Sequence, residues 1–244
     1  MNDAELAAHL AADAGRILME VRASGRHHGK ELGRAGDAEA NAVLVKALSE
    51  LRPDDGLLSE EEKDSAARLS KSRVWIVDPL DGTREYAEER DDWAVHVALA
   101  VDGVADAGAV AMPALGLVLR SDRPLAPPSR PSRPRMIVSR TRPAAEALDV
   151  ADALGAEIVT MGSAGAKAMA VVRGEADIYL HSGGQHQWDN CAPVAVAQAH
   201  GLHCSRLDGS PLIYNRPDTL MPDLLICSAE WASATLDALA TARG

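Results

Sequence analysis

The sequence predicts a mixed fold, α+β in its first half and α/β in its second. Two stretches with helical spacing of apolar residues, 4–21 and 38–51, precede several short consecutive strands. That order predicts helices stacked on a mainly antiparallel sheet. Beyond residue 135, strands and helices alternate along the chain, as they do in α/β units. A proline-rich stretch, 122–135, separates the halves, so we expect one unit over 1–125 and another over 135–244.

The elements of the first half follow from local patterns. Ser24 to Gly36 is rich in glycine and basic residues and is expected to be a loop or a short irregular strand. Asp37 then stands where a helix N-cap would. The apolar run Val74 to Val77 predicts a buried strand, which should end at Asp78-Pro79 because proline has no N–H for a ladder. Further strands are expected at 92–100, 108–112 and 115–120.

The second half shows the same alternation. Strands are expected at 136–140, 157–161, 176–180 and 224–227, and helices at 142–154, 166–172, 191–199 and 231–240. Gly183-Gly184 is expected to form a flexible turn, and Asp189 is expected to be an N-cap.

Composition excludes several classes of protein. The formal net charge of the 244 residues is −11, whereas nonspecific binding to nucleic acid needs a basic surface. No segment is apolar for the length of a membrane span. The three cysteines are odd in number and not closely spaced, which argues against disulfides and a zinc site and favours the cytoplasm. Because Phe is absent, Ala, Val and Leu must pack the core.

Two carboxylates follow the strand 74–77 on a rigid turn, in the sequence Asp78-Pro79-Leu80-Asp81-Gly82-Thr83. This turn can direct Asp78, the Leu80 carbonyl and Asp81 at one point, which gives the hard oxygen ligands that Mg²⁺ prefers. If Thr83 begins a helical turn, the Gly82 and Thr83 N–H groups form an anion site beside the metal. Asp-Pro and Asp-Gly are also ordinary turn signals, so a plain turn is the alternative.

The longer string W-I-V-D-P-L-D-G-T resembles the metal-binding signature of the inositol monophosphatase superfamily of Mg²⁺-dependent, lithium-sensitive phosphatases. Three more segments are similar to that family in the same order: Asp37, Glu60-Glu61 after Ser59, and Trp188-Asp189. The continuation D-G-T-R-E-Y resembles its CysQ-type 3′(2′),5′-bisphosphate nucleotidases. The resemblance implies a layered αβαβα sandwich.

The resemblance also implies roles for these residues. Glu60, Asp78 and the Leu80 carbonyl would hold one Mg²⁺, and Asp78, Asp81 and Asp189 a second, with a third held more loosely. The catalytic residues implied are Asp37, Thr83 and Glu61; Thr83, paired with Asp37, would orient the attacking water. Taken alone, Asp37 and Asp189 could simply cap helices, and 60–62 could be a solvated helix start whose register is ambiguous by one residue.

A further set of residues is expected to contact the substrate. Gly82 and Thr83 would bind the phosphate, and Ser163 and Lys167 match the Ser-x-x-x-Lys spacing that nucleotidase relatives use beside the nucleotide. Lys167 could equally be a solvated residue. His181 stands where relatives often have Arg, and Arg140, at the end of a strand, is a further candidate.

The activity implied is hydrolysis of the 3′-phosphate of 3′-phosphoadenosine 5′-phosphate (PAP) to AMP, or of its sulfated analogue (PAPS), in sulfate assimilation. An inositol-1-phosphate or fructose-1,6-bisphosphate phosphatase is the alternative, because all would share these ligands. A binding or regulatory protein of the same fold is the alternative of another class. The expected binding partner is then a small phosphate ester, and no nucleic acid or membrane is expected to bind. The sequence is also compatible with a homodimer.

Overall fold

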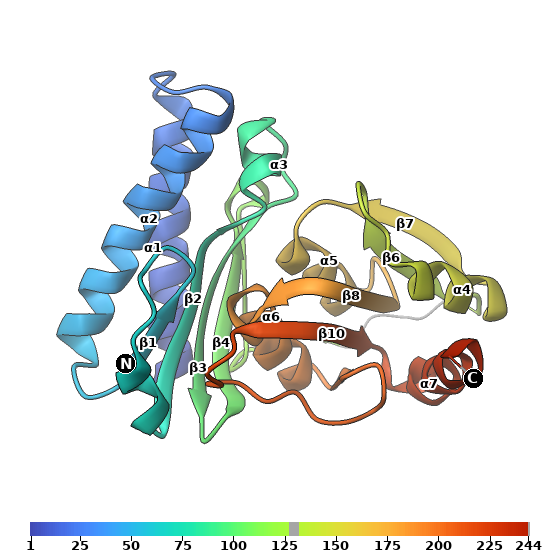
Figure 1. The fold of residues 1–244 in the computed structure, drawn as a ribbon. Helices are drawn as coiled ribbons and strands as arrows, with labels where there is room; N and C mark the ends of the chain where they lie inside the picture. Colours follow the sequence, from blue (N-terminus) through green and yellow to red (C-terminus); the bar gives the residue numbers. More distant parts are fainter. Residues whose placement is uncertain (127–131, 244) are drawn as a thin grey trace.

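The structure, a computed structural model, describes residues 1–126 and 132–243. Its elements stack in five layers of helices, sheet, helices, sheet and helices (Figure 1). The predicted αβαβα sandwich is therefore confirmed. No helix in these two ranges has both the length and the apolar character needed to cross a bilayer.

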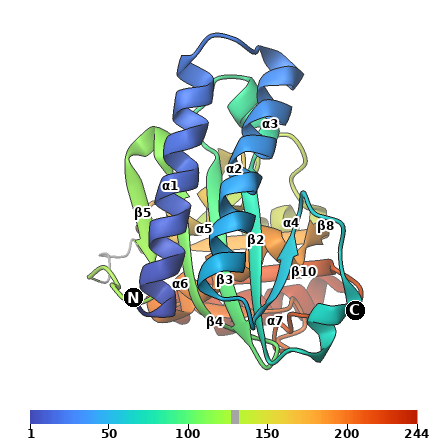
Figure 2. The same cartoon turned by 90° about the vertical axis from the view of Figure 1, so that its left-hand side faces the viewer.

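The first two layers comprise a helix pair and a sheet. Helices α1 (Asp3–Ala23) and α2 (Gly29–Leu51) lie side by side on one face of the sheet (Figure 2). The strands run in chain order as β1 (Gly56–Ser59), β2 (Arg73–Asp81), β3 (Ala94–Val101), β4 (Val104–Met112) and β5 (Leu117–Arg120). Only β1 and β2 are parallel, which confirms a mainly antiparallel sheet. Helix α3 (Thr83–Ala87) follows β2, and 3-10 turns span Ala66–Ser70 and Pro113–Leu115.

The other three layers belong to the second half. Its sheet has the order β7-β6-β8-β10-β9. The strands are β6 (Arg135–Ser139), β7 (Glu157–Met161), β8 (Ile178–His186), β9 (His203–Ser205) and β10 (Leu220–Cys227). Helices α5 (Ala164–Val172) and α6 (Gln187–Ala199) lie between the sheets, and α4 (Ala145–Ala153) and α7 (Ala229–Arg243) cover the outer face (Figure 1). Strand β9 was not predicted.

Three buried clusters fill the spaces between the layers. One lies under α1 and α2, one surrounds α5 and α6 between the sheets, and one lies under α4 and α7. Ala, Val and Leu make up most of all three, as the absence of Phe requires. The proposed boundary at 122–135 includes residues 127–131, which lie outside the described residues, and the division into two units stays a prediction.

The predicted loop over 24–36 is wrong from Gly29 onward, because α2 begins there. Asp37 consequently lies inside the helix and not at its N-cap. The glycines that suggested a loop serve close packing instead. A Cβ on Gly33 would lie 2.7 Å from Thr83 Cγ2, and one on Gly36 would lie 2.9 Å from Leu18 Cδ2. Small residues were needed there for contact, not for a turn.

Two further expectations are corrected in the strands. Strand β2 does not end at Asp78-Pro79 but continues to Asp81, with a register irregularity against β3 between Asp78 and Asp81. A proline is tolerated at such an irregularity because no ladder N–H is needed there. Likewise Gly183 and Gly184 lie inside β8, at φ +75° and +79°, opposite a register shift in β10.

Candidate metal centre and active site

The irregular end of β2 sets the centre of the site. Asp78 of β2 pairs with His96 of β3, and Asp81 pairs with Ala94. The two β2 residues between Asp78 and Asp81 therefore leave the regular ladder. Asp78 Oδ1 accepts a hydrogen bond from the Leu80 N–H at 3.0 Å. Both carboxylates are buried, and together with Asp189 they offer oxygen atoms that all lie within 4.8 Å of one another.

Strand β1 brings a fourth carboxyl group to this cluster. It runs parallel to β2 with Ser59 opposite Val77, and the Glu60 N–H donates to the Val77 carbonyl at 3.3 Å. Glu60 thus lies beside Asp78, where burial first and then the charge of Glu60 raise the pKa of Asp78. Glu62 is directed elsewhere, since Asn41 donates to it at 2.7 Å. Glu60 is therefore placed against Asp78, whereas Glu62 is not.

Helix α6 supplies the remaining carboxylate of the cluster, Asp189. The predicted N-cap at Asp189 is wrong by three residues, because the cap is His186. Asp189 is the third helical residue, and its Oδ2 accepts a hydrogen bond from the His186 N–H at 2.5 Å. This reciprocal capping arrangement holds its carboxylate toward Asp81.

Asp37 and Thr83 meet as the sequence predicts. Thr83 Oγ1 lies 3.4 Å from Asp37 Oδ2 and 3.2 Å from the Leu80 carbonyl oxygen, so its hydroxyl proton can be donated to either. Asp37 Oδ1 is buried and has no hydrogen-bond partner among the described residues. A buried carboxylate oxygen without a donor is costly unless a cation or water satisfies it.

The electrostatics of the cluster favour a cation. Burial, together with the charges of Glu61 and Glu60, raises the pKa of Asp37 to about 8. Burial and the charge of Asp81 raise the pKa of Asp189 to about 7. The pKa values of Glu60 and Asp78 are raised as well, by burial first in each case.

The cluster suits a hard divalent cation. The donors are all oxygens, one buried oxygen lacks a partner among the described residues, and burial together with mutual repulsion makes the ionised carboxylates unfavourable without a cation. The described residues can therefore bind a metal ion at this cluster.

Asp81 differs from its neighbours, and a residue that the sequence analysis missed explains why. Burial raises its pKa, but His96, the Gly165 N–H and the charge of Lys167 together hold the pKa below its ordinary value. The fully buried His96 has Nε2 3.2 Å from Asp81 Oδ2, which is an ion pair when the imidazole is protonated. Burial lowers the pKa of His96, but Asp81 and the Trp188 carbonyl raise it above the ordinary value. His96 Nδ1 lies 3.0 Å from the Trp188 carbonyl oxygen, which can only accept, so Nδ1 carries a proton. His96 thus joins β3, Asp81 and the residue before Asp189.

The start of α5 completes the surroundings of Asp81. The N–H groups of Ala164 and Gly165 donate to its two carboxylate oxygens at 3.2 and 2.6 Å. A Cβ on Gly165 would lie 2.1 Å from His96 Nε2 and 3.0 Å from Asp81 Oδ2. Only glycine therefore fits at Gly165, because of sterics and not because of its backbone angles.

A cavity of about 600 Å³ opens beside Asp81, Gly82, Thr83 and Asp189. The substrate candidates that line it are mostly engaged by the protein itself. Ser163 Oγ accepts the Ala166 N–H as the cap of α5. Lys167 donates to the Gly162 and Ser163 carbonyls, and its burial lowers its pKa to about 8.

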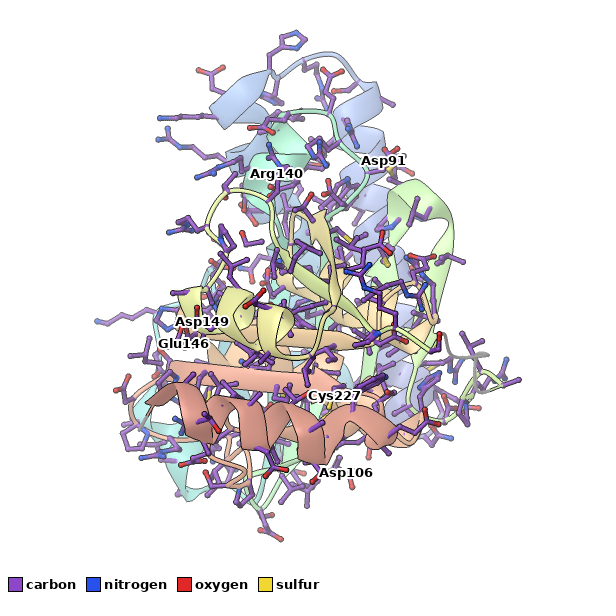
Figure 3. The ribbon with its side chains drawn as sticks, turned by 90° about the vertical axis from the view of Figure 1, so that its right-hand side faces the viewer. Asp91, Asp106, Arg140, Glu146, Asp149 and Cys227 are labelled. Atoms are coloured by element: carbon purple, nitrogen blue, oxygen red, sulfur yellow. The ribbon has the colours of Figure 1, made fainter. Side chains whose placement is uncertain are left out.

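His181 and Arg140 have other surroundings. His181 lies in β8, with Nε2 2.9 Å from the Gly183 carbonyl oxygen, and burial lowers its pKa. Arg140 is not a lining residue of the cavity: it pairs with Glu85 at 3.0 Å and Glu88 at 2.9 Å, beside α3 (Figure 3). Arg142, two residues further on, does line it, and its side chain has no described partner. All these roles stay predictions.

The metal-free protein should become less stable as the pH rises from about 4 to about 8. The folded chain keeps protons on Asp37 and Asp189 that the unfolded chain, with ordinary carboxyl pKa values, has already lost. Since these two carboxyl groups bind more protons in the folded state throughout this window, their contribution to stability is lost as the pH rises through their folded pKa values. Thermal unfolding in a chelator, at several pH values between about 5 and 8, measures the slope.

Two controls sharpen this expectation. Added Mg²⁺ should flatten the slope because a cation displaces the same protons, and Asp37→Asn should reduce it in the metal-free protein. Lys167, whose pKa burial lowers to about 8, titrates at the upper end of the window and above, so it does not reverse the sign. A metal-free melting temperature that rises from pH 5 to 8 would contradict the assignment.

Comparisons with known proteins agree with this geometry. Residues 2–124 and 129–243 match the model of the inositol monophosphatase family. The chain is 52% identical over 242 residues to a Mycobacterium bovis protein named 3′-phosphoadenosine 5′-phosphate phosphatase, covering 94% of this chain and 90% of that one. It is 31% identical to the 3′(2′),5′-bisphosphate nucleotidase CysQ of Escherichia coli K12, over 77% of this chain and 81% of the other.

Solved structures show the same fold. The CysQ of Bacteroides thetaiotaomicron superposes with a TM-score of 0.80 at 24% identity, covering 93% of this chain and 97% of that one. An inositol monophosphatase from Anabaena gives 0.77 at 23% identity, over 98% and 95%. With the family model matching nearly the whole chain, the protein belongs to the inositol monophosphatase family, whose members are metal-dependent.

Proposed function

We propose that this protein is a Mg²⁺-dependent phosphomonoesterase that hydrolyses the 3′-phosphate of PAP to AMP. The observation that carries the reaction is the all-oxygen cluster of Asp78, Asp81 and Asp189 beside the Asp37–Thr83 pair. The identity of 52% with a relative named for PAP hydrolysis supports the substrate. The sulfated analogue PAPS differs only at the 5′ end and is a second candidate substrate.

The ligand sets follow the positions of the carboxyl groups. Glu60, Asp78 and the Leu80 carbonyl would hold one Mg²⁺, and Asp78, Asp81 and Asp189 a second; any third would lie near Glu60. When bound, Mg²⁺ would neutralise charge that develops on the phosphoryl group and increase the acidity of water.

The chain itself supplies the proton acceptor and the orientation of the water. Thr83 donates its hydroxyl proton to Asp37 or to the Leu80 carbonyl, which leaves the Thr83 oxygen free to accept a hydrogen bond from the attacking water. Asp37 lies behind Thr83 and, when ionised, can take up the proton that this water loses. Glu61 adds negative charge that keeps Asp37 basic. The Gly82 and Thr83 N–H groups would donate to phosphate oxygens.

Recognition of the rest of the substrate takes place in the 600 Å³ cavity. Lys167 donates hydrogen bonds to the Gly162 and Ser163 carbonyls and so stabilises this turn. It would contribute positive charge near Asp81 and would not contact the substrate directly. Burial keeps His181 neutral at pH 7, so it is a weak phosphate partner. Arg142, exposed in the cavity wall, is a better candidate for the second phosphate because a guanidinium binds phosphate oxygens in pairs.

Phosphate release from PAP tests the reaction type. The protein should release inorganic phosphate with Mg²⁺, lose that activity in excess EDTA, and regain it when Mg²⁺ is restored. Asp149→Asn, which makes the same chemical change on the exposed surface of α4, is the control for general damage by purification or mutation. Release that EDTA does not affect would contradict a metal-dependent reaction, and no release under any condition would contradict the proposed function.

A further inference from the structure

A second cleft, of about 530 Å³, lies between α2 and α3 on the other side of Thr83. Lys30 and Arg34 line it from α2, and Arg84 lines it from α3. Thr83 and Arg84 also line the larger cavity, so the two hollows meet at the catalytic threonine. A molecule that reaches this cleft is therefore already beside the site.

The three basic residues of the cleft carry unneutralised charge. All are exposed, and none forms a hydrogen bond or an ion pair through its side chain with another described residue. The acidic residue of the cleft, Glu88, is already engaged by Arg140, at 2.9 Å. Arg90, by contrast, is paired with Asp92. The three cations of the cleft thus form a local positive group in a chain whose net charge is −11.

The position of these cations is fixed by close packing. Lys30 and Arg34 are four residues apart, so they lie on the same face of the helix, and Gly33 beside them contacts Thr83 directly. No larger residue fits at Gly33, because its Cβ would lie 2.7 Å from Thr83 Cγ2. The packing therefore keeps the basic face of α2 beside the catalytic threonine.

The charges of the substrate and of the protein suggest what these cations do. A bisphosphate nucleotide carries about four negative charges, and the protein that must bind it is itself strongly acidic. A local group of cations at the mouth of a site raises the concentration of oppositely charged substrate there, and this effect decreases with ionic strength. A substrate with one phosphate benefits less.

We propose that Lys30, Arg34 and Arg84 form a capture surface for multiply charged phosphate substrates, which it delivers across Thr83 to the active site. The inference rests on the proposed function and adds two residues, Lys30 and Arg34, that belong neither to the carboxylate cluster nor to the larger cavity. Solvated cations with no such role are the alternative.

The test compares the double variant Lys30→Gln/Arg34→Gln with Lys46→Gln/Arg123→Gln. The second pair removes the same two charges from exposed positions; Lys46 lies about 24 Å further along α2. At low ionic strength, kcat/KM for PAP should fall about five- to tenfold in the first variant, with kcat within about twofold of wild type. For adenosine 3′-monophosphate the loss should be about twofold, and both losses should vanish near 0.5 M salt.

Three results would overturn the capture surface: no loss, an equal loss in the control variant, or a loss that persists at high salt. Turnover of PAP by the wild type reports on the proposed function separately. If it is absent, the same variants are compared by equilibrium binding of PAP at low salt, which needs no turnover. Equal dissociation constants for wild type and Lys30→Gln/Arg34→Gln would then reject the inference.

Discussion

The Asp78→Asn variant should lose about a thousandfold of its Mg²⁺-dependent turnover while its metal-free form unfolds at a temperature no lower than that of the wild type. An asparagine oxygen can still accept the Leu80 N–H, so the local backbone keeps its partner. The substitution removes a carboxyl group whose ionised form is disfavoured by burial and by the charges of Glu60, Asp81 and Asp189. Phosphate release and thermal unfolding, each with Mg²⁺ and with EDTA, measure both effects.

The two effects together separate a metal site from a structural carboxylate. In wild type, Mg²⁺ should raise the melting temperature, whereas in Asp78→Asn it should not. The surface variant Asp149→Asn, on α4 (Figure 3), should respond to Mg²⁺ as the wild type does. A metal-free Asp78→Asn protein that is clearly less stable than wild type would mean that the carboxylate supports the fold by itself.

Gly165→Ala, one added methyl group, should reduce stability and turnover together. Its Cβ would meet His96 Nε2 and Asp81 Oδ2, and both are held by other contacts. Overpacking of this kind costs about 2 to 3 kcal/mol, which lowers the melting temperature of a chain of this size by about 5 to 10 °C. A displacement of Asp81 by about 1 Å would reduce kcat about a hundredfold.

A double-mutant cycle with His96→Ala identifies the cause. Removing the imidazole gives the new methyl group space, so Gly165→Ala should destabilise the His96→Ala protein much less than the wild type. The coupling should exceed about 1 kcal/mol. Additive effects would show that the contact with His96 is not what requires glycine at 165. The turnover of the double variant should stay low, because Asp81 has then lost its ion pair.

The features that the sequence predicted well are local. The apolar run before Asp78 is a buried strand, because a strand is favoured by its own residues, and the two carboxylates at its end converge although the strand continues through them to Asp81. The fold class and the family are also confirmed, and both were carried by motifs in four separate segments. The roles of the site residues stay predictions.

Features that depend on tertiary contacts could not be predicted. The extension of α2 to Gly29 was obscured by glycines whose purpose is contact with Thr83 and Leu18. The side chain of Lys167 has the expected spacing, yet it turns back to its own helix start, which spacing cannot reveal. His96 did leave a signal: it is the only ionisable residue in the apolar stretch 94–101, where an unpaired charge would be costly.

One kinetic comparison tests most directly whether this phosphatase acts on a nucleotide substrate. With Mg²⁺ present, kcat/KM is measured for PAP, inositol-1-phosphate and fructose-1,6-bisphosphate. We expect PAP to be preferred by about a hundredfold or more, which corresponds to about 2.7 kcal/mol of differential transition-state binding. Comparable values for the three substrates, or a preference for either of the other two, would contradict the nucleotide assignment while leaving the metal centre in place.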